Sequence, residues 1–432
     1  MRVLMFGWEF PPHITGGLGT ASYGLTKGMS KLEDLEVIFV VPKVWGDEDQ
    51  TKVRLIGANQ VPVAHKKVFF RGSRRQIEKI EVSSRIVPYT DPEEFWKMTR
   101  SEISEQGIVI QTNNKGTIDF TGKYGETLFD EIYKYSVVAA VIAEENEFDI
   151  IHAHDWLAYP AGIAAMRVSG KPLVIHVHAT DFDRSGGNVN PDVYRIEKEG
   201  MDAASKIITV SNLTRDIVIN KYNIDPDKVE TVYNAVEPFR ISAEVVKEKG
   251  FDEKVVTFLG RITLQKGPEY FIEAANKVLK VMPNVRFVMA GSGDMMERMM
   301  RRAAALKITD RFHFTGFLKG LDVYTMLSMS DVYIMPSVSE PFGISPLEAM
   351  QSNVPVIISK QSGVSEILTH AVKVDFWDID EMADAIYGIL NYPALAKMFI
   401  KNGREEVVRL KWDNSARHVR DIYYRVIWQN KN

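Results

Sequence analysis

Cysteine is absent from the 432 residues of the chain. Disulfide bridges, thiolate metal ligands and cysteine nucleophiles are therefore excluded. Long apolar runs are missing too, since stretches such as 137–143 meet charged residues well short of the roughly 20 residues that cross a bilayer. The first residues read as a short strand, without the apolar segment and cleavage site of a signal peptide. We expect a cytoplasmic protein with no transmembrane segment.

The sequence also lacks a surplus of positive charge. Its formal net charge is −4 and its isoelectric point is near 6.2, so it has no broad basic field to attract nucleic acid. Hydrophobic residues make up 45% and charged residues 25% of the chain, as in globular proteins. A chain of 432 residues exceeds one ordinary hydrophobic core, which predicts two domains. Nothing in the composition indicates an oligomeric state.

The most informative stretch is 340–348, Glu-Pro-Phe-Gly-Ile-Ser-Pro-Leu-Glu, because it joins a predicted strand to a predicted helix. The apolar run 331–337 is short and rich in strand formers, which favours a buried strand of a parallel sheet. Ser345 suits the N-cap of the following helix, with a proline next to it. Backbone N–H groups near Gly343 and Ile344 would then face the strand end, where α/β proteins bind anions.

Two carboxylates, Glu340 and Glu348, bracket this turn. A ligand with a hydroxylated and an anionic part would suit both. Without a ligand, Glu348 would complete a capping box with Ser345, contributing about 1 kcal/mol of helix stability, and Glu340 would be a solvated loop carboxylate. The pair and its spacing resemble the Glu-x7-Glu motif of retaining glycosyltransferases with the GT-B fold. That group contains glycosyltransferase family 4 and the glycogen and starch synthases.

Two cations, Arg261 and Lys266, follow another predicted strand, 255–260. Arginine offers a planar fork and lysine a mobile point charge, which together suit a diphosphate, although exposed cations on a loop are usually only solvated. The segment 260–267, Gly-Arg-Ile-Thr-Leu-Gln-Lys-Gly, resembles the Gly-Arg-x4-Lys-Gly motif of the same families. The resemblance implies that both cations stabilise a leaving nucleoside diphosphate.

Near the N-terminus, Gly16 and Gly17 lie between a predicted strand over 2–7 and a predicted helix over 20–31. Glycines at such a point let a ligand approach the backbone and the helix N-terminus, although a plain tight turn uses the same residues. They resemble the Gly-Gly loop of family 4 enzymes and glycogen synthases. Bacterial glycogen synthases carry a lysine where this chain has Ile14, a difference that favours another family 4 enzyme.

Two predicted strands, within 149–156 and 173–181, each end in His-x-His, which places each histidine pair on one face of its strand. Such strand ends could form a metal site. Buried histidines satisfied by hydrogen bonds are commoner, and we expect no metal. His154-Asp-Trp resembles a glycogen synthase sequence in which the histidine contacts the donor sugar.

The segment that follows the second histidine pair resembles a family 4 variant at the place where acceptor and donor sugar meet. By that resemblance, three of its residues contact substrate: His178, Asp181 and Arg184. Glycine turns follow two further predicted strands, and four of their residues are expected near the nucleotide: Gly291, Gly293, Gly316 and Leu318.

Strands and helices alternate in both halves of the chain, which favours an α/β protein with doubly wound parallel sheets. The resemblance implies the GT-B fold, in which two Rossmann-like domains face each other across a cleft. We expect an acceptor-side domain over 1–237 and a nucleotide-sugar-binding domain over 238–412. An insertion at about 45–121 has no assigned function, and a C-terminal helix over 413–432 should pack back on the first domain. Four residues are expected on the apolar face of that helix: Tyr423, Tyr424, Val426 and Trp428.

The resemblance also implies a role for each residue. Arg261 and Lys266 neutralise the leaving diphosphate, helped by the N–H groups near Gly343 and Ile344 and by the Gly16-Gly17 turn. Glu348 holds the ribose hydroxyls, Glu340 contacts the donor sugar, and His154 orients the primary hydroxyl of that sugar. Retention without an obvious nucleophile fits a front-face transfer in which the leaving phosphate takes the acceptor proton. The nucleoside-diphosphate sugar is a co-substrate, and no metal or other cofactor is expected.

These expectations describe a hexosyltransferase with a carbohydrate acceptor. The His-Asp-Trp and Gly-Gly-Leu sequences favour a glycogen or α-glucan synthase that uses ADP- or UDP-glucose. Ile14 and the 178–184 variant favour a family 4 transferase acting on a small sugar, a lipid or another polysaccharide, and GDP as the donor base also stays open. A GT-B nucleotide-sugar 2-epimerase would not be expected to keep both motifs. A non-catalytic sugar-binding protein would not be expected to keep their four charged residues.

Overall fold

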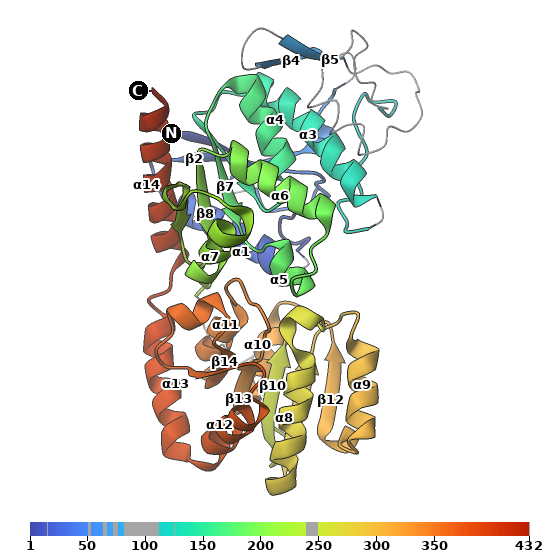
Figure 1. Ribbon diagram of the computed structural model, residues 1–432, viewed down its shortest axis with the longest axis vertical. Helices are drawn as coiled ribbons and strands as arrows, with labels where there is room; N and C mark the ends of the chain where they lie inside the picture. The colour runs from blue at the N-terminus through green and yellow to red at the C-terminus, as the bar shows by residue number, and fades with distance from the viewer. Residues whose placement is uncertain are drawn as a thin grey trace.

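A computed structural model describes residues 1–14, 16–50, 53–63, 67–71, 77–81, 112–125, 127–238 and 249–431. Figure 1 shows two lobes, one above the other, with the C-terminal helix running along the upper, N-terminal lobe. Each lobe is built on a parallel sheet between helices, so the predicted α/β architecture with doubly wound sheets is confirmed. No helix in these ranges is both long and apolar enough to cross a membrane.

The sheet of the N-terminal lobe has seven parallel strands in the order β3-β2-β1-β6-β7-β8-β9. The strands are β1 (Arg2–Phe6), β2 (Glu36–Val41), β3 (Arg54–Gly57), β6 (Ile150–His154), β7 (Leu173–Val177), β8 (Lys206–Thr209) and β9 (Val229–Thr231). Their residues are mostly buried, because helices cover both faces of the sheet. Strand order reverses between β1 and β6, which makes this pair the topological switch point.

Helices α3, α4 and α6 pack on one face of this sheet, and α1 and α14 pack on the other. The helices of the lobe are α1 (Gly17–Met29), α3 (Leu128–Glu145), α4 (Tyr159–Ser169), α5 (Asp181–Ser185), α6 (Pro191–Ala203) and α7 (Asn212–Tyr222), with short 3-10 turns η1 (Ala58–Gln60) and η2 (Pro226–Lys228). One face of α3 is buried, since Ile132, Val138 and Ile142 are buried and Leu128 is partly buried.

The sheet of the C-terminal lobe repeats this topology with six parallel strands in the order β12-β11-β10-β13-β14-β15, so its switch point lies between β10 and β13. Its strands are β10 (Lys254–Leu259), β11 (Val285–Ala290), β12 (Phe312–Gly316), β13 (Val332–Met335), β14 (Val356–Ser359) and β15 (Val372–Val374). Its helices are α8 (Pro268–Val281), α9 (Met296–Ala305), α10 (Leu321–Ser328), α11 (Ser345–Gln351), α12 (Ile379–Asn391) and α13 (Pro393–Val407), with 3-10 turns η3 (Leu264–Lys266), η4 (Thr309–Arg311) and η5 (Gly363–Glu366).

The last helix, α14 (Trp412–Lys431), packs on α1 and on the N-terminal sheet, where the sequence predicted it to lie. Its buried stripe follows the helical period: Trp412, Ala416, Val419, Ile422, Tyr423 and Val426. Of the four residues expected on the apolar face of α14, Tyr423 and Val426 are therefore confirmed as buried, and the other two are wrong. Tyr424 is 46% exposed and Trp428 is 68% exposed, because each follows a buried residue by one or two positions and so turns to the other side of the helix.

Part of the expected insertion belongs to the main sheet. Strand β3 pairs with β2 at the sheet edge, so the segment around it is no insertion. Strands β4 (Lys67–Arg71) and β5 (Ile77–Glu81) form a separate antiparallel pair, in keeping with a hairpin. Most of the remaining stretch, 82–111, lies outside the described residues, and so do residues 239–248, just after the predicted domain boundary at 237/238.

Candidate functional site

The two switch points bring the predicted residues together at the carboxyl ends of the strands. Arg261 and Lys266 follow β10, and Glu340 follows β13, the strand beside it. In the other lobe, the glycine loop follows β1, and His154 ends β6. Open α/β sheets bind ligands in the crevice outside these strand ends.

Lys266 and Glu340 contact each other. Nζ of Lys266 lies 2.5 Å from Oε2 of Glu340, whose side chain is only 8% exposed. The hydroxyl of Ser337 donates to the same oxygen at 3.0 Å. The backbone N–H of Glu340 donates to Gln361, and its carbonyl accepts from the N–H of Gly363, both at 2.9 Å. The carboxylate predicted to contact the sugar is thus fixed in place, and a bound diphosphate would compete with it for Lys266.

Arg261 lies on the exposed loop between β10 and η3. Lys266 ends η3, and the next residue, Gly267, has φ +65°. A Cβ there would lie 2.0 Å from the carbonyl oxygen of Pro336, so only glycine fits. The turn allows α8 to start at once with Pro268, and it keeps both cations at the strand end.

Helix α11 starts differently from the prediction. Ile344 is its N-cap, Ser345 is its first residue, and no side chain caps its N-terminus. The hydroxyl of Ser345 is instead 2.8 Å from the phenol of Tyr333, which donates to it from β13. The alternative of a capping box between Ser345 and Glu348 is therefore wrong, because a tertiary contact has taken the serine side chain.

Glu348 is half-buried in the first turn of α11. Burial raises the pKa of its carboxyl group to about 7. Gly343 precedes the helix with φ +101°, a conformation that favours glycine. Glu348 therefore does not cap the helix. Its carboxyl group, with a pKa of about 7, lies beside the N–H groups of the turn.

The predicted nucleotide glycines also pack against protein backbone. Gly291 has φ +142°, and a Cβ there would lie 1.8 Å from the carbonyl oxygen of Gly260. At Gly293 a Cβ would lie 2.3 Å from the carbonyl oxygen of Ile262. The loop after β11 is therefore pressed against the loop that carries Arg261. Two other predicted residues lie beyond β11: Gly316, which has φ +73° and accepts the N–H of Gly291, and Leu318, which is partly buried.

In the N-terminal lobe, Gly16 is the N-cap of α1 and has extended backbone with φ −170°. Among the described residues, which leave out position 15, no side chain caps this helix end. A Cβ added at Gly16 or Gly17 would meet nothing within 4 Å. Packing therefore does not require these glycines, and their missing side chains leave open space in front of the helix N-terminus, where anions are favoured.

Four histidines form a buried group where β6 and β7 end. The ring of His152 stacks on that of His154 with centroids 4.3 Å apart, and His176 stacks on His178 at 4.4 Å. Nδ1 of His154 lies 2.9 Å from Nε2 of His178 and links the two strands. His154 has 0% exposure, whereas His178 keeps some exposed surface. In this state His178, and not the predicted His154, is the histidine nearest to solvent.

Burial keeps these imidazoles neutral. It lowers the pKa of His152 to about 3, helped by His178, and lowers the pKa of His178 to about 3, helped by the Arg184 guanidinium. The pKa values of His154 and His176 also fall well below the usual range because of burial. The group therefore acts as neutral hydrogen-bonding rings and carries no positive charge for a diphosphate.

Protein groups satisfy only part of the hydrogen-bonding capacity of these histidines. Five ring nitrogens find no partner among the described residues: His152 Nε2, His154 Nε2, His176 Nδ1, His176 Nε2 and His178 Nδ1. Ring nitrogens of His152, His154 and His176 lie within 4.8 Å of one another, and neutral imidazole is the form that binds metal ions. This trio includes no carboxylate, so a divalent cation held by it alone would be a costly buried charge.

Arg184 is held by other protein groups. Its Nη2 lies 2.6 Å from Asp155 and its Nη1 lies 3.1 Å from Glu197. Burial raises the pKa of Glu197 to about 7 although Arg184 opposes the shift. Asp181, the first residue of α5, accepts the N–H of Asn190 at 2.6 Å. The predicted substrate residues Arg184 and Asp181 thus also order the segment after β7.

The lobes contact each other beside the site. The hydroxyl of Ser339 donates to Oδ1 of Asp183 in α5 at 2.5 Å. The other carboxylate oxygen of Asp183 accepts from the N–H and hydroxyl of Thr180, both at 2.8 Å, in a capping box. Farther along the interface, Glu366 accepts the N–H groups of Asn212 and Leu213 at the start of α7. Sequence reasoning missed Asp183, although Thr-x-x-Asp is a detectable capping signal.

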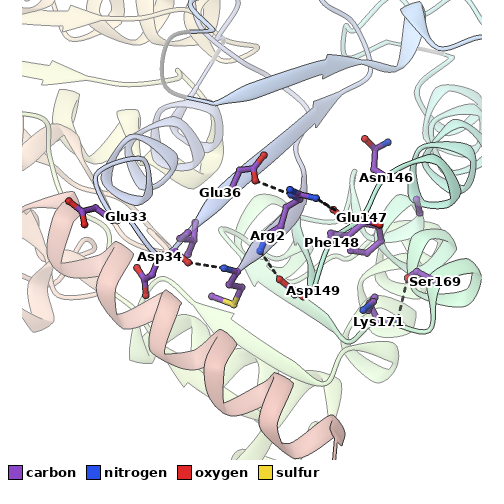
Figure 2. A pocket seen from close by; sticks show the side chains of 13 residues that line it. Arg2, Glu33, Asp34, Glu36, Asn146, Glu147, Phe148, Asp149, Ser169 and Lys171 are labelled. Atoms are coloured by element: carbon purple, nitrogen blue, oxygen red, sulfur yellow. Dashed lines mark hydrogen bonds and ion pairs between the residues drawn. The ribbon is translucent and has the colours of Figure 1, made fainter.

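A separate hollow of about 730 Å³ lies at the amino ends of β1 and β6. Figure 2 shows Arg2 at its centre, paired with Glu36 and bonded through its backbone N–H to Asp149. The hollow lies at the opposite edge of the sheet from the strand ends described above. It is therefore distinct from the predicted site.

Comparisons with known proteins identify the family. The family model described as glycosyl transferases group 1 matches residues 242–406, and that of glycosyltransferase family 4 matches residues 123–240. An uncharacterized glycosyltransferase of Methanocaldococcus jannaschii is 27% identical over 98% of both chains. Glycogen synthase of Mycobacterium tuberculosis is 22% identical over 98% of this chain and 94% of its own.

A solved structure supports the same conclusion about the fold. Sucrose-phosphate synthase from Thermosynechococcus elongatus matches with a TM-score of 0.70 over 99% of each chain, at 17% identity. With the two Rossmann-like sheets described above, this likeness confirms the predicted GT-B fold.

Proposed function

We propose that this chain, which belongs to the group 1 and family 4 glycosyltransferases, moves a glucosyl unit from a nucleoside-diphosphate sugar to a glycogen-like α-glucan with retention of configuration. Membership of the family supports hexosyl transfer in general. Glucosyl transfer to glucan is supported by His154-Asp-Trp and by the similarity to a glycogen synthase over almost the whole chain.

The contact between Lys266 and Glu340 carries the proposal. An ammonium group and a fixed carboxylate lie 2.5 Å apart at a switch point. In the proposal, the ammonium serves the leaving diphosphate and the carboxylate serves the donor sugar. Arg261 stands on the same loop as a second cation. Because charge develops on the diphosphate as the glycosidic bond breaks, cations already in place stabilise the transition state more than the ground state. We therefore propose that transfer itself requires no metal ion.

Other residues divide the remaining tasks. Glu348 holds the ribose hydroxyls in its ionised form, and the N–H groups of Gly343 and Ile344 assist the diphosphate together with the Gly16-Gly17 turn. Helix α11 has only seven residues, so individual N–H groups matter more here than a helix dipole. His154 and His178 together orient the primary hydroxyl of the donor sugar. The leaving phosphate takes the acceptor proton.

A second candidate is a family 4 transferase that acts on a small sugar, a lipid or another polysaccharide. One observation favours it: Ile14 stands where bacterial glycogen synthases have a lysine. An aliphatic side chain beside the Gly16-Gly17 turn supplies no charge, so this turn would bind a donor phosphate less strongly than in those enzymes.

The experiment is nucleoside diphosphate release from ADP-, UDP- and GDP-sugars, with and without glycogen. Release from ADP- or UDP-glucose that rises with glycogen supports a glucan synthase and identifies the donor. Release that ignores glycogen, or that needs another sugar, supports the second candidate. The Glu340→Ala variant is the control, and release that persists in it would contradict the assigned site. The product anomer, read by NMR, tests retention.

A further inference from the structure

The C-terminal helix contributes a hydroxyl group to the buried histidines. Tyr423 in α14 has 0% exposure, and its phenol is hydrogen bonded to Nδ1 of His152. The two residues are 271 positions apart in the chain. The neighbouring Tyr424 points the other way, is 46% exposed, and donates to Asp34 at 3.0 Å. One tyrosine of the pair thus reaches the histidines, and the other lies at the surface.

Contacts continue from His152 toward the edge of the cleft. Its ring stacks on that of His154 with centroids 4.3 Å apart and planes 26° apart. His154 in turn shares a hydrogen bond of 2.9 Å with His178, which keeps some exposed surface. Tyr423, His152, His154 and His178 therefore form one unbroken series of contacts from α14 to the strand ends.

Because the histidine rings are neutral, the position of the proton on each ring depends on its hydrogen-bond partner, starting with Tyr423. The phenol of Tyr423 can accept from a protonated Nδ1 of His152 or donate to a bare one, and donation requires the tautomer whose proton is on Nε2. Between His154 and His178, one nitrogen must carry the proton and the other must accept it, because neither ring is protonated twice. Several other nitrogens of these rings have no partner within the described ranges, so few hydrogen bonds besides those of the series hold their orientation.

The same helix also supports the glycine loop. The indole of Trp412 covers Gly24 of α1, where an added Cβ would lie 2.3 Å from the ring. Helix α1 starts at Gly17, directly after the proposed phosphate turn. Helix α14 thus contacts both elements that the N-terminal lobe brings to the site.

We propose that Tyr423 is a positioning residue: it fixes the tautomer and ring orientation of His152, and through that ring it aligns His154 and His178 with the donor sugar. The inference rests on the proposed function only in assigning those two histidines to the sugar. The chemistry recognised there is a sugar hydroxyl, which a neutral imidazole can either donate to or accept from.

The first test needs no activity. In protein with ¹⁵N-labelled histidine, two-bond ¹H–¹⁵N spectra report which ring nitrogen carries the proton, and single histidine substitutions assign the signals. Tyr423→Phe removes one oxygen and should change the signals of His152, His154 and His178, whereas Tyr424→Phe should change none of them. Unchanged signals of His154 and His178 in Tyr423→Phe would overturn the proposal.

The second test uses turnover. Tyr423→Phe should lower kcat/KM for the donor about tenfold, the effect of leaving one buried hydrogen-bonding group unpaired, and Tyr424→Phe should leave it unchanged. His152→Asn should cause a similar loss, and the double variant should lose no more than either single one, because both changes break the same series. If the losses of kcat/KM in the two single variants add up in the double variant, Tyr423 and His152 act independently, and the proposed series of contacts is wrong. If the wild type releases no nucleoside diphosphate, the proposed function fails, and the spectra still decide whether Tyr423 controls the histidines.

Discussion

Replacing Lys266 with alanine tests the central contact of the site through two separate quantities. The substitution removes the cation that lies 2.5 Å from Glu340 and leaves a carboxylate that is only 8% exposed without its partner. Loss of one partner of a buried pair costs about 3–5 kcal/mol of stability, and the 21% exposure of Lys266 places this case near the lower end, at about 3 kcal/mol. Loss of a transition-state contact of about 3 kcal/mol lowers turnover at least a hundredfold.

The assay combines urea unfolding with nucleoside diphosphate release at saturating donor. Lys277→Ala is the matched control, because that lysine pairs with Asp380 at the surface with side-chain exposures of 40% and 80%. It should cost at most about 1 kcal/mol of stability and leave turnover unchanged. Near-normal turnover of Lys266→Ala would refute the role given to the cation.

A double variant separates the two effects. Adding Glu340→Gln to Lys266→Ala removes the unpaired charge, so most of the lost stability should return, since Ser337 can still bond the amide. Turnover should stay at least a hundredfold low, because the diphosphate still lacks its cation. Recovery of turnover together with stability would mean that Lys266 acts only on folding.

Three further measurements follow from the structure. Burial raises the pKa of Glu348 to about 7, so its carboxyl group takes up a proton as the pH falls through neutrality. The KM for the donor should therefore rise as the pH is lowered from 8 to 6 in the wild type. In Glu348→Gln the KM should not change over this range. The pKa of His152 falls to about 3 on folding, so between about pH 6.5 and pH 3 only the unfolded chain binds a proton there. This group should therefore lower the free energy of unfolding by about 2 kcal/mol at pH 5 relative to pH 8. Urea unfolding of His152→Asn should lack this pH-dependent loss. Gly291→Ala should fail to accumulate as folded protein, because a Cβ at Gly291 would lie 1.8 Å from the carbonyl oxygen of Gly260. Gly388→Ala should fold normally, because a Cβ at Gly388 would meet nothing within 4 Å. A normal melting curve for Gly291→Ala would contradict the geometry.

Local chemistry explains why many elements could be predicted from the sequence. Helix α7 begins at Asn212 because Ser211 accepts the N–H of Thr214 and caps it, which is a signal that the sequence carries. Strand β11, which precedes the predicted glycine turn, is a mostly apolar run, as expected for a buried parallel strand. Strand ends and switch points then follow from the order of elements, and they bring Lys266 into contact with Glu340.

Contacts between distant residues could not be predicted in this way. The phenol of Tyr333 takes the Ser345 side chain away from the helix end, and nothing near Ser345 signals that choice. Ser339 and Asp183 are 156 residues apart, so their bond depends on how the lobes meet. Strand β3 carries only four residues, too few for the alternation that would have separated it from a loop.

Four residues after β13 hold both the Glu340 carboxylate and a contact to the other lobe. Ser337 and Lys266 hold Glu340, while Ser339, its neighbour, holds Asp183 in the other lobe. A diphosphate that draws Lys266 away must leave Glu340 with Ser337 alone, unless a sugar hydroxyl replaces the cation as its partner. In the proposed function, donor binding therefore changes the contacts of a residue next to the lobe interface. Helix α5, which carries Asp183, also contains Arg184, which adds to burial in lowering the pKa of His178. The proposed phosphate chemistry and the order of the N-terminal lobe thus meet in one short loop.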